Sequence, residues 1–326
     1  MRPRLSARRL HPRSEGSAVK PEVPVLAASV IICTRNRHDL LAGSVHSILD
    51  ADHVPAEIII VDQSDGPLVA LDVPSGPCRV RHVQATPDGS SSARNRGAAE
   101  AGEDTLVFTD DDMIADARWL QSLVNTLFHA RPNDVVTGRV LAGCAEIAGA
   151  FVPATVDATR PGVYIGRLSR DVLAGGNMAI RRTAFLSSGG FDTRLGPGSR
   201  FPAAEDNDFG FRVLEQGGRI LYEPAAVLYH RAWRAPAAFL PLRFAYGRGK
   251  GGFYAKHLHI RDTHMLRRLI VDLACRPVRA ARFALHPRRG LGELAYGMGM
   301  LRGLVEWSLG SFAPRRTVPA PVRLAR

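Results

Sequence analysis

Short apolar runs alternate with amphipathic segments along the first third of the chain. Three runs are apolar at their centres and rich in β-branched residues, as strands buried on both faces are: 29–34, 57–62 and 105–109. Between them, residues 38–49 place apolar side chains on one helical face, and residues 90–101 combine serine N-cap candidates with good helix formers. This alternation predicts an α/β domain with a mostly parallel sheet flanked by helices.

The pattern continues less regularly as far as residue 235. Residues 118–128 predict an amphipathic helix, residues 142–170 are irregular, and residues 187–206 form a loop of the length that is usually functional. The remaining predicted elements are a short strand near 80–83, strands at 134–141 and 173–182, a helix in "EDNDFGFRVLEQGG", and two short strands in "RILYEP" and "AVLYHR".

Polar clusters follow the three apolar runs. "TRNR" comes after the first, "DQSD" after the second and "DDD" after the third. The carboxyl ends of parallel strands meet at one edge of a sheet, and ligands of such sheets bind there. The sequence therefore predicts a binding site at this edge.

The third cluster consists of three consecutive acids, Asp110, Asp111 and Asp112. Two like charges about 4 Å apart repel by roughly 4 kcal/mol at an effective dielectric constant of about 20. Successive side chains of an extended segment point to opposite sides, so Asp110 and Asp112 share a side and Asp111 points elsewhere. A Mg²⁺ or Mn²⁺ ion that bridges carboxylates to phosphate would offset the repulsion. Capping of the following helix is the alternative.

Three further groups of polar residues are candidates for a functional site. Asp62 and Asp65 lie where a base or ribose would be bound, although an Asx turn explains them equally well. Glu205 and Asp206 stand at a predicted helix start, where they stabilise the positive end of the helix dipole or provide a general base. His230 ends a predicted strand.

The formal net charge of +12 is unevenly distributed. Residues 1–24 carry six basic and two acidic groups, residues 25–230 carry 18 and 25, and residues 231–326 carry 19 and four. In the last third, Leu291, Leu294, Met298, Leu301 and Val305 repeat at helical spacing. This stripe is either a packing surface or the apolar face of a basic amphipathic helix on an anionic membrane.

The differences in charge and in hydrophobic pattern divide the chain into a disordered basic tail (1–24), an α/β domain (25–235) and a basic amphipathic helical region (236–326). No apolar run reaches 18 residues, so we expect no spanning helix, and the start of the chain lacks a convincing signal-peptide cleavage site. The four cysteines form no C-x-x-C pair, which fits a reducing compartment. We expect a cytoplasmic protein, peripheral at the inner face of the cell membrane.

Six motifs resemble, in order, those of glycosyltransferase family 2: "SVIICTRNR", "IIIVDQSD", "SSARNRG", "FTDDDM", "AGGNMAIRR" and "GGFDTRLGPGSRFPAAEDNDFGFRVL". The resemblance covers roughly residues 27–235. It implies the GT-A fold, a Rossmann-like nucleotide-binding architecture, and an inverting enzyme that uses a nucleotide-sugar and a divalent cation, Mn²⁺ or Mg²⁺.

The resemblance also implies roles for individual residues. Asp206 matches the catalytic base, with Glu205 beside it. Asp112 and Asp110 match the metal-binding D-x-D acids, and His230 falls where many members place a residue that binds metal or diphosphate. The residues expected to contact the nucleotide-sugar are Thr34, Arg35, Asp62, Arg94, Asp110, Asp111, Gly176 and Asn177.

The expected partners are a UDP-, GDP- or dTDP-sugar donor, a glycan or lipid-linked acceptor and an anionic membrane surface, with no nucleic acid. One alternative is a sugar nucleotidyltransferase of the same fold, but "ICTRNRHDL" lacks the glycine-rich phosphate loop typical of those enzymes. The other alternative is a non-catalytic protein that binds membranes or polyanions through its basic last third.

Overall fold

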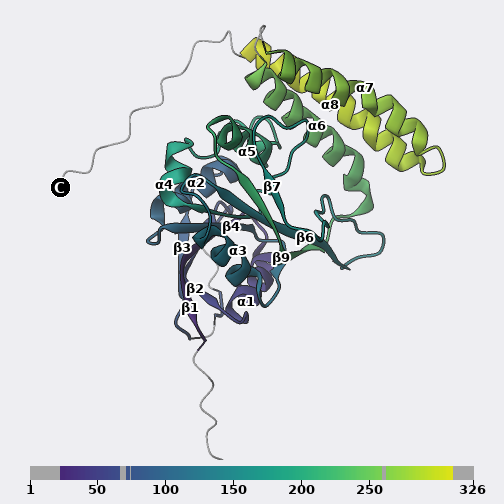
Figure 1. Ribbon diagram of the computed structural model, residues 1–326. Coiled ribbons are helices and arrows are strands. Elements are labelled where there is room, and N and C mark those ends of the chain that lie inside the picture. The colour runs from purple at the N-terminus through teal and green to yellow at the C-terminus, as the bar shows by residue number, and fades with distance from the viewer. Residues whose placement is uncertain (1–22, 67–70, 74, 259–261, 311–326) are drawn as a thin grey trace, which may run out of the picture.

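The computed structural model describes residues 23–66, 71–73, 75–258 and 262–310. Figure 1 shows an α/β domain from which one helix leads to a pair of long helices at the C-terminal end. The predicted tail of residues 1–24 falls outside the described residues except for its last two positions.

The described residues contain one nine-stranded sheet. In spatial order its strands are β3 (Arg79–Gln84), β2 (Val54–Asp62), β1 (Val25–Thr34), β4 (Thr105–Asp110), β8 (Asn177–Arg181), β6 (Val135–Ala145), β9 (Ile220–Ala232) and β5 (Met113–Ala115), and β7 (Gly162–Tyr164) pairs with β9. The strands from β3 to β4 are mutually parallel, and β8 runs antiparallel to both of its neighbours. The predicted α/β class is confirmed.

Helices cover both faces of the sheet because alternate residues of the apolar strands point in opposite directions. Val30 and Ile32 of β1 join a core with α1 (His38–Leu49) and α3 (Trp119–Phe128). Ile31 joins the opposite core, which contains side chains of three helices: α2 (Ser90–Glu100), α4 (Arg182–Ser187) and α5 (Glu205–Glu215). Burial on both faces explains why these strands read as continuous apolar runs.

The two short strands predicted near residues 219–231 form one strand, β9. Pro224 interrupts the sequence pattern because it has no amide proton to donate to a neighbouring strand. The register against β6 passes from Gly138–Glu223 to Arg139–Val227, so an irregularity absorbs the proline and the strand continues. The structure also adds β5 and β7, neither of which the pattern predicted.

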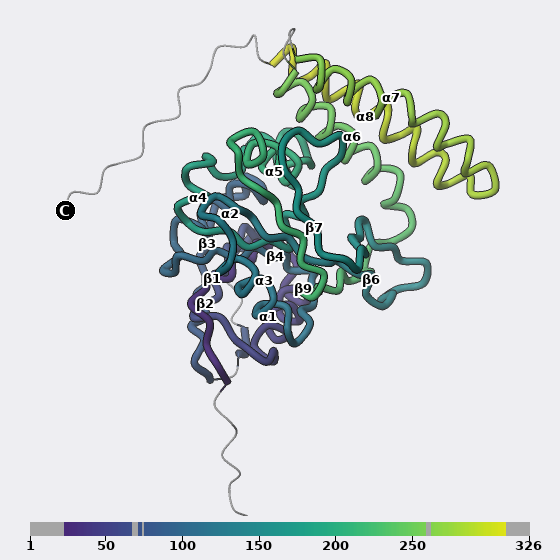
Figure 2. Tube along the Cα trace, in the orientation of Figure 1, coloured from purple at the N-terminus to yellow at the C-terminus, as the bar shows by residue number. Residues whose placement is uncertain are grey.

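Three long helices follow the sheet: α6 (Phe239–His257), α7 (Thr263–Arg282) and α8 (Pro287–Gly310), with the short helix η1 (Pro236–Ala238) before them. Figures 1 and 2 show α6 between the domain and the hairpin of α7 and α8. None of the described helices is long and apolar enough to cross a membrane. The helical character predicted for this region is present, but α6 was missed because its "GRGKGG" segment looks like a loop.

Those glycines let α6 and α8 pack backbone against backbone. A Cβ atom on Gly247 or Gly251 of α6 would collide with the carbonyl oxygens of Tyr296 and Met300. A Cβ atom on Gly303 of α8 would likewise collide with the carbonyl oxygen of Arg248. Close approach at these positions offsets the low helix propensity of glycine.

We predict that Gly303→Ala destabilises the protein by about 1–3 kcal/mol, because rigid backbone must shift to admit the methyl group. Gly297→Ala in the same helix is the matched control, since its Cβ would meet only Arg276 side-chain atoms at 3.5 Å. The control should be neutral or slightly stabilising, because alanine favours helix. Unfolding followed by circular dichroism distinguishes the two, and equal stability of both variants would show that the close approach is unimportant.

Candidate active site

A cavity of about 550 Å³ opens at the carboxyl ends of β1 and β4. Its walls come from the sheet, from α2, from the loop before α5, and from the C-terminal helices α6 and α8. This is the edge of the sheet at which the polar clusters were predicted to meet, and the volume suits a ligand of drug-like size.

The side chains of the three consecutive acids point in alternating directions, as the extended backbone predicts. Asp110 and Asp112 line the cavity. Asp111 is fully buried and does not line it: Thr34 Oγ1 donates a hydrogen bond to its Oδ2 at 2.7 Å, and Arg37 lies 2.6 Å from its Oδ1. Burial raises the pKa of Asp111 to about 7, although Arg37 opposes the shift. Asp111, which was expected to contact the nucleotide-sugar, therefore lies outside the cavity lining and positions Thr34 and Arg37.

Asp112 sits among positively charged and hydrogen-bonding groups. The Trp233 indole donates to its Oδ2 at 3.1 Å, Arg37 lies 3.3 Å away, and the His230 ring lies 3.6 Å away. Burial alone would raise the pKa of Asp112, but His230 and Arg37 outweigh it and hold that pKa well below its usual range. Asp112 is therefore ionised at neutral pH.

The donor set around Asp112 fits a hard divalent cation. His230 is buried, and neither of its ring nitrogens has a hydrogen-bond partner among the described residues. Those residues contain no cluster of three or more His, Cys, Asp or Glu side chains that could hold a metal ion. Mg²⁺ and Mn²⁺ commonly take one or two protein carboxylates and complete their shell with water and substrate phosphate. Asp112 and His230 suit that arrangement.

Arg94 of α2 joins the acids of β4 to those of α5. Its guanidinium donates to Asp110 Oδ1 at 2.6 Å and to Glu205 Oε1 at 2.9 Å. Burial alone would lower the pKa of Arg94, but Asp110 and Glu205 outweigh burial and raise it. A buried arginine between two carboxylates therefore fixes the distance between the two acid clusters.

Two glycines before β8 let the backbone pass close to these acids. A Cβ on Gly176 would collide with the Asp110 carboxylate, and one on Gly175 would come within 2.9 Å of Asp206 Cβ. Gly176 lines the cavity as expected, but Asn177 does not. The Asn177 amide is fully buried and bonds to Trp119 and to backbone carbonyls of β6 and β9. Asn177, which was expected to line the sugar site, holds α3, β6 and β9 together through these hydrogen bonds.

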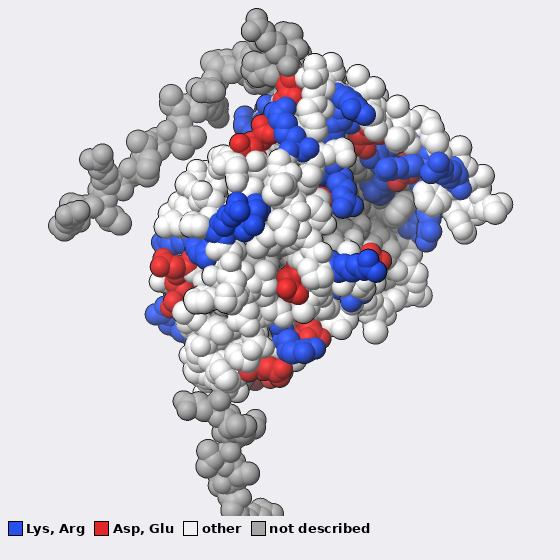
Figure 3. All heavy atoms as spheres, in the orientation of Figure 1, with Lys and Arg blue, Asp and Glu red and all other residues white. Residues whose placement is uncertain are grey.

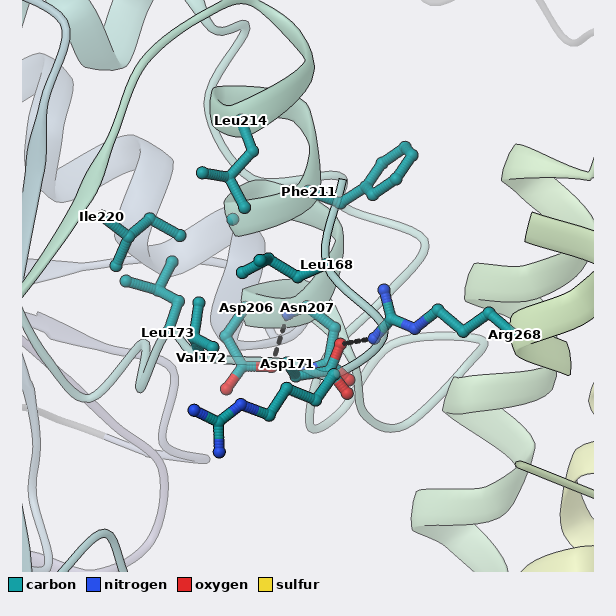
Figure 4. Close-up of a pocket in the computed structure, with 12 residues that line it drawn as sticks. Leu168, Asp171, Val172, Leu173, Asp206, Asn207, Phe211, Leu214, Ile220 and Arg268 are labelled. Carbon is teal, nitrogen blue, oxygen red and sulfur yellow. Dashed lines mark hydrogen bonds and ion pairs between the residues drawn. The ribbon is translucent and has the colours of Figure 1, made fainter. Parts of the chain in front are cut away.

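Asp206 occupies the first turn of α5, after Ala204 in the left-handed conformation with φ of 72°. Its Oδ1 accepts a hydrogen bond of 2.7 Å from the Asn207 amide. Burial, followed by the negative charges of Glu205 and Asp171, raises the pKa of Asp206 to about 7. Figure 4 shows Asp206 beside Asp171, toward which Arg268 reaches from α7. The strained backbone before Asp206 is typical of functional sites.

Of the residues predicted to bind at the ends of the first two strands, some line the cavity and others do not. Arg35 lines the cavity and is exposed, 3.6 Å from Asp65. Asp62 lies outside the lining, where it accepts from the Ser64 amide at 2.8 Å and lies 3.1 Å from the His82 ring. Its neighbour Gln63 lines the cavity instead.

The sequence alone did not reveal several residues that line or support the cavity. Arg37 and Arg234 both lie near Asp112, and Tyr246 and Tyr296 reach in from α6 and α8. Lys250 of α6 is buried and donates to Asp171 at 2.6 Å. The "TRNR" and "HRAWR" segments could have suggested the arginines, but nothing in a glycine-rich segment indicates a helix that completes a site.

The fold matches the GT-A fold of solved glycosyltransferase structures. A mannosyltransferase from Pyrobaculum calidifontis superimposes with a TM-score of 0.53 at 16% identity, over 86% of this chain and 87% of that one. Residues 29–186 match the family model described as "Glycosyl transferase family 2". The chain is similar to this family over that segment.

Two named relatives are each 26% identical to the chain. One is a glucosyl-dolichyl phosphate glucuronosyltransferase from Haloferax volcanii, aligned over 66% of this chain and 72% of the relative. The other is a pre-mycofactocin glycosyltransferase from Mycobacterium tuberculosis, aligned over 72% of this chain but only 49% of the relative.

Proposed function

We propose that the protein is a metal-dependent, inverting glycosyltransferase that moves a sugar from a nucleotide-sugar to a hydroxyl group of a glycan or lipid-linked acceptor. The observation that carries this proposal is the link through Arg94 between Asp110 on the donor side and Glu205 beside Asp206. It holds a cation-binding acid cluster and a candidate base at the edge of one cavity.

The leaving group of the transfer is a nucleoside diphosphate, whose negative charge grows as the glycosidic bond breaks. Asp112 and His230 would hold a divalent cation that neutralises this charge when it is bound. Arg37 and Arg234, both close to Asp112, supply further positive charge on the same side. The mannosyltransferase that shares the fold was solved with GDP-mannose and Mn²⁺.

The nucleophile is a hydroxyl group that must lose its proton as it attacks the anomeric carbon. Asp206 is suited to accept that proton, because a base with a pKa near 7 is about half ionised and still sufficiently basic at neutral pH. Direct attack with one base and no covalent intermediate inverts the anomeric configuration. Glu205 is less suited to the task, since Arg94 already engages its carboxylate.

We predict that Asp206→Asn lowers the transfer rate by about 10²–10⁴-fold, because the amide cannot accept the proton. In the wild type the rate should rise with pH through about 7, as the raised pKa of Asp206 leaves the carboxyl protonated below that value. Initial rates against pH measure both effects, with nucleotide-sugar affinity as the check that the donor site is intact.

Asp50→Asn is the control for the loss of one surface carboxylate, since Asp50 is exposed at the end of α1. It should keep the wild-type rate and pH profile. Near wild-type turnover in Asp206→Asn would show that another group is the base.

We predict that Mn²⁺ strengthens nucleotide-sugar binding by the wild type and that Asp112→Asn abolishes this strengthening. The substitution removes the carboxylate charge beside His230 while keeping the shape of the side chain. Calorimetric titration with UDP-, GDP- and dTDP-sugars, with and without Mn²⁺, measures the effect without relying on turnover. Metal-dependent binding that is identical in the variant would rule out Asp112 as a ligand.

A further inference from the structure

A second cavity of about 550 Å³ lies between α7 and the segment of residues 169–171, outside the catalytic cavity. Arginines dominate its walls, so that positive charge exceeds negative charge. The positively charged lining residues are Arg170, Arg267, Arg268, Arg276 and Arg279, and the negatively charged ones are Asp171 and Asp272.

Three of these arginines have no counter-charge. Arg170, Arg267 and Arg279 are exposed and form no ion pair with any other described residue. By contrast, Arg268 pairs with Asp171, although its buried Nε has no hydrogen-bond partner among the described residues. Unpaired guanidinium groups around one cavity point to an anionic ligand, and their forked donors suit phosphate oxygens.

The cavity adjoins the catalytic one. Tyr296 of α8 lines both. Asp171 and Arg268, which line the basic cavity, also share a smaller hollow with Asp206, as Figure 4 shows. An anion held by the arginines therefore lies on the side of the site that contains the proposed base, which is the acceptor side.

The outer face of the α7–α8 hairpin is apolar and is not covered by any of the described residues. On α8 the stripe from Leu291 to Val305 stands more than 40% exposed at each position, on the face opposite the glycines that pack against α6. Leu266 and Ile270 of α7 are also exposed, and Leu285 between the two helices is 91% exposed. Figure 3 shows lysine and arginine side chains gathered around this hairpin. A basic helix pair with an exposed apolar face suits an anionic lipid surface.

We propose that the acceptor is a glycan carried on a lipid phosphate: the basic cavity binds the phosphate group, a sugar hydroxyl of the glycan reaches Asp206, and the apolar face of the hairpin contacts the membrane that carries the lipid. This inference rests on the proposed function, since an acceptor requires a transferase. It assigns to the C-terminal helices the recognition of the acceptor, which the motifs of the α/β domain leave open.

The test uses the full chain and phosphatidylcholine vesicles that contain farnesyl phosphate, with farnesol vesicles and soluble glycerol 3-phosphate as comparison probes. Arg267→Ala/Arg279→Ala removes two unpaired arginines of the cavity. Arg282→Ala/Arg289→Ala is the matched control, because both residues are exposed on the same hairpin and neither lines the cavity. Co-sedimentation gives the affinity for each vesicle, and calorimetry gives the affinity for nucleotide-sugar and for glycerol 3-phosphate.

We expect the wild type to bind farnesyl phosphate vesicles at least tenfold more tightly than farnesol vesicles. The cavity variant should lose that preference, and the control should keep it. Equal loss in both variants would overturn the cavity assignment, because bulk charge would then explain binding. Equally tight binding of glycerol 3-phosphate would overturn the lipid assignment.

Nucleotide-sugar binding separates this inference from the proposed function. Intact nucleotide-sugar binding by a wild type that ignores farnesyl phosphate would overturn the inference alone. Farnesyl phosphate binding by a wild type that binds no nucleotide-sugar would overturn the proposed function and, with it, the assignment of the lipid as an acceptor.

Discussion

The buried guanidinium of Arg94 is the interaction on which the active site depends. It donates to Asp110 at the end of β4 and to Glu205 at the start of α5, and both bonds are short. Removing one partner from a buried ion pair costs about 3–5 kcal/mol, because the remaining charge stays buried without compensation. The carboxylates proposed to serve the donor and the acceptor are therefore held in one rigid unit, although Asp110 of β4 and Asp206 are 96 positions apart in the sequence.

The C-terminal helices belong to this unit rather than forming a separate appendage. A Cβ on Gly249 would come within 2.5 Å of the Ala203 carbonyl oxygen, so the α6 backbone presses on the segment that leads into Glu205 and Asp206. Lys250, on the next position, reaches Asp171, whose charge contributes to the raised pKa of Asp206. The packing of α6 thus positions Lys250 and Asp171, and the charge of Asp171 affects the pKa of Asp206, the proposed base.

Much of this architecture could be predicted from local pattern. The apolar runs gave the central strands, and the helix at residues 38–49 has the predicted bounds, because burial on one or both faces leaves a period in the sequence. The alternation of Asp110, Asp111 and Asp112 separated the cavity-lining acids from the buried one. Tertiary contacts explain what local pattern does not show. Asn177 was predicted as a ligand contact, but its amide bonds to Trp119 in the core. Helix α6 was missed because its glycines are explained by tertiary contacts, with α8 about 50 residues later in the chain and with Ala203 before α5.

The central claim is a single displacement in which Asp206 activates the acceptor and no covalent sugar–enzyme intermediate forms. The anomeric configuration of the product, determined by nuclear magnetic resonance after transfer from an α-linked nucleotide-sugar, tests this claim most directly. A β-linked product is predicted, because attack comes from the face opposite the departing diphosphate. An α-linked product would contradict the claim, since retention requires either two displacements or attack from the same face.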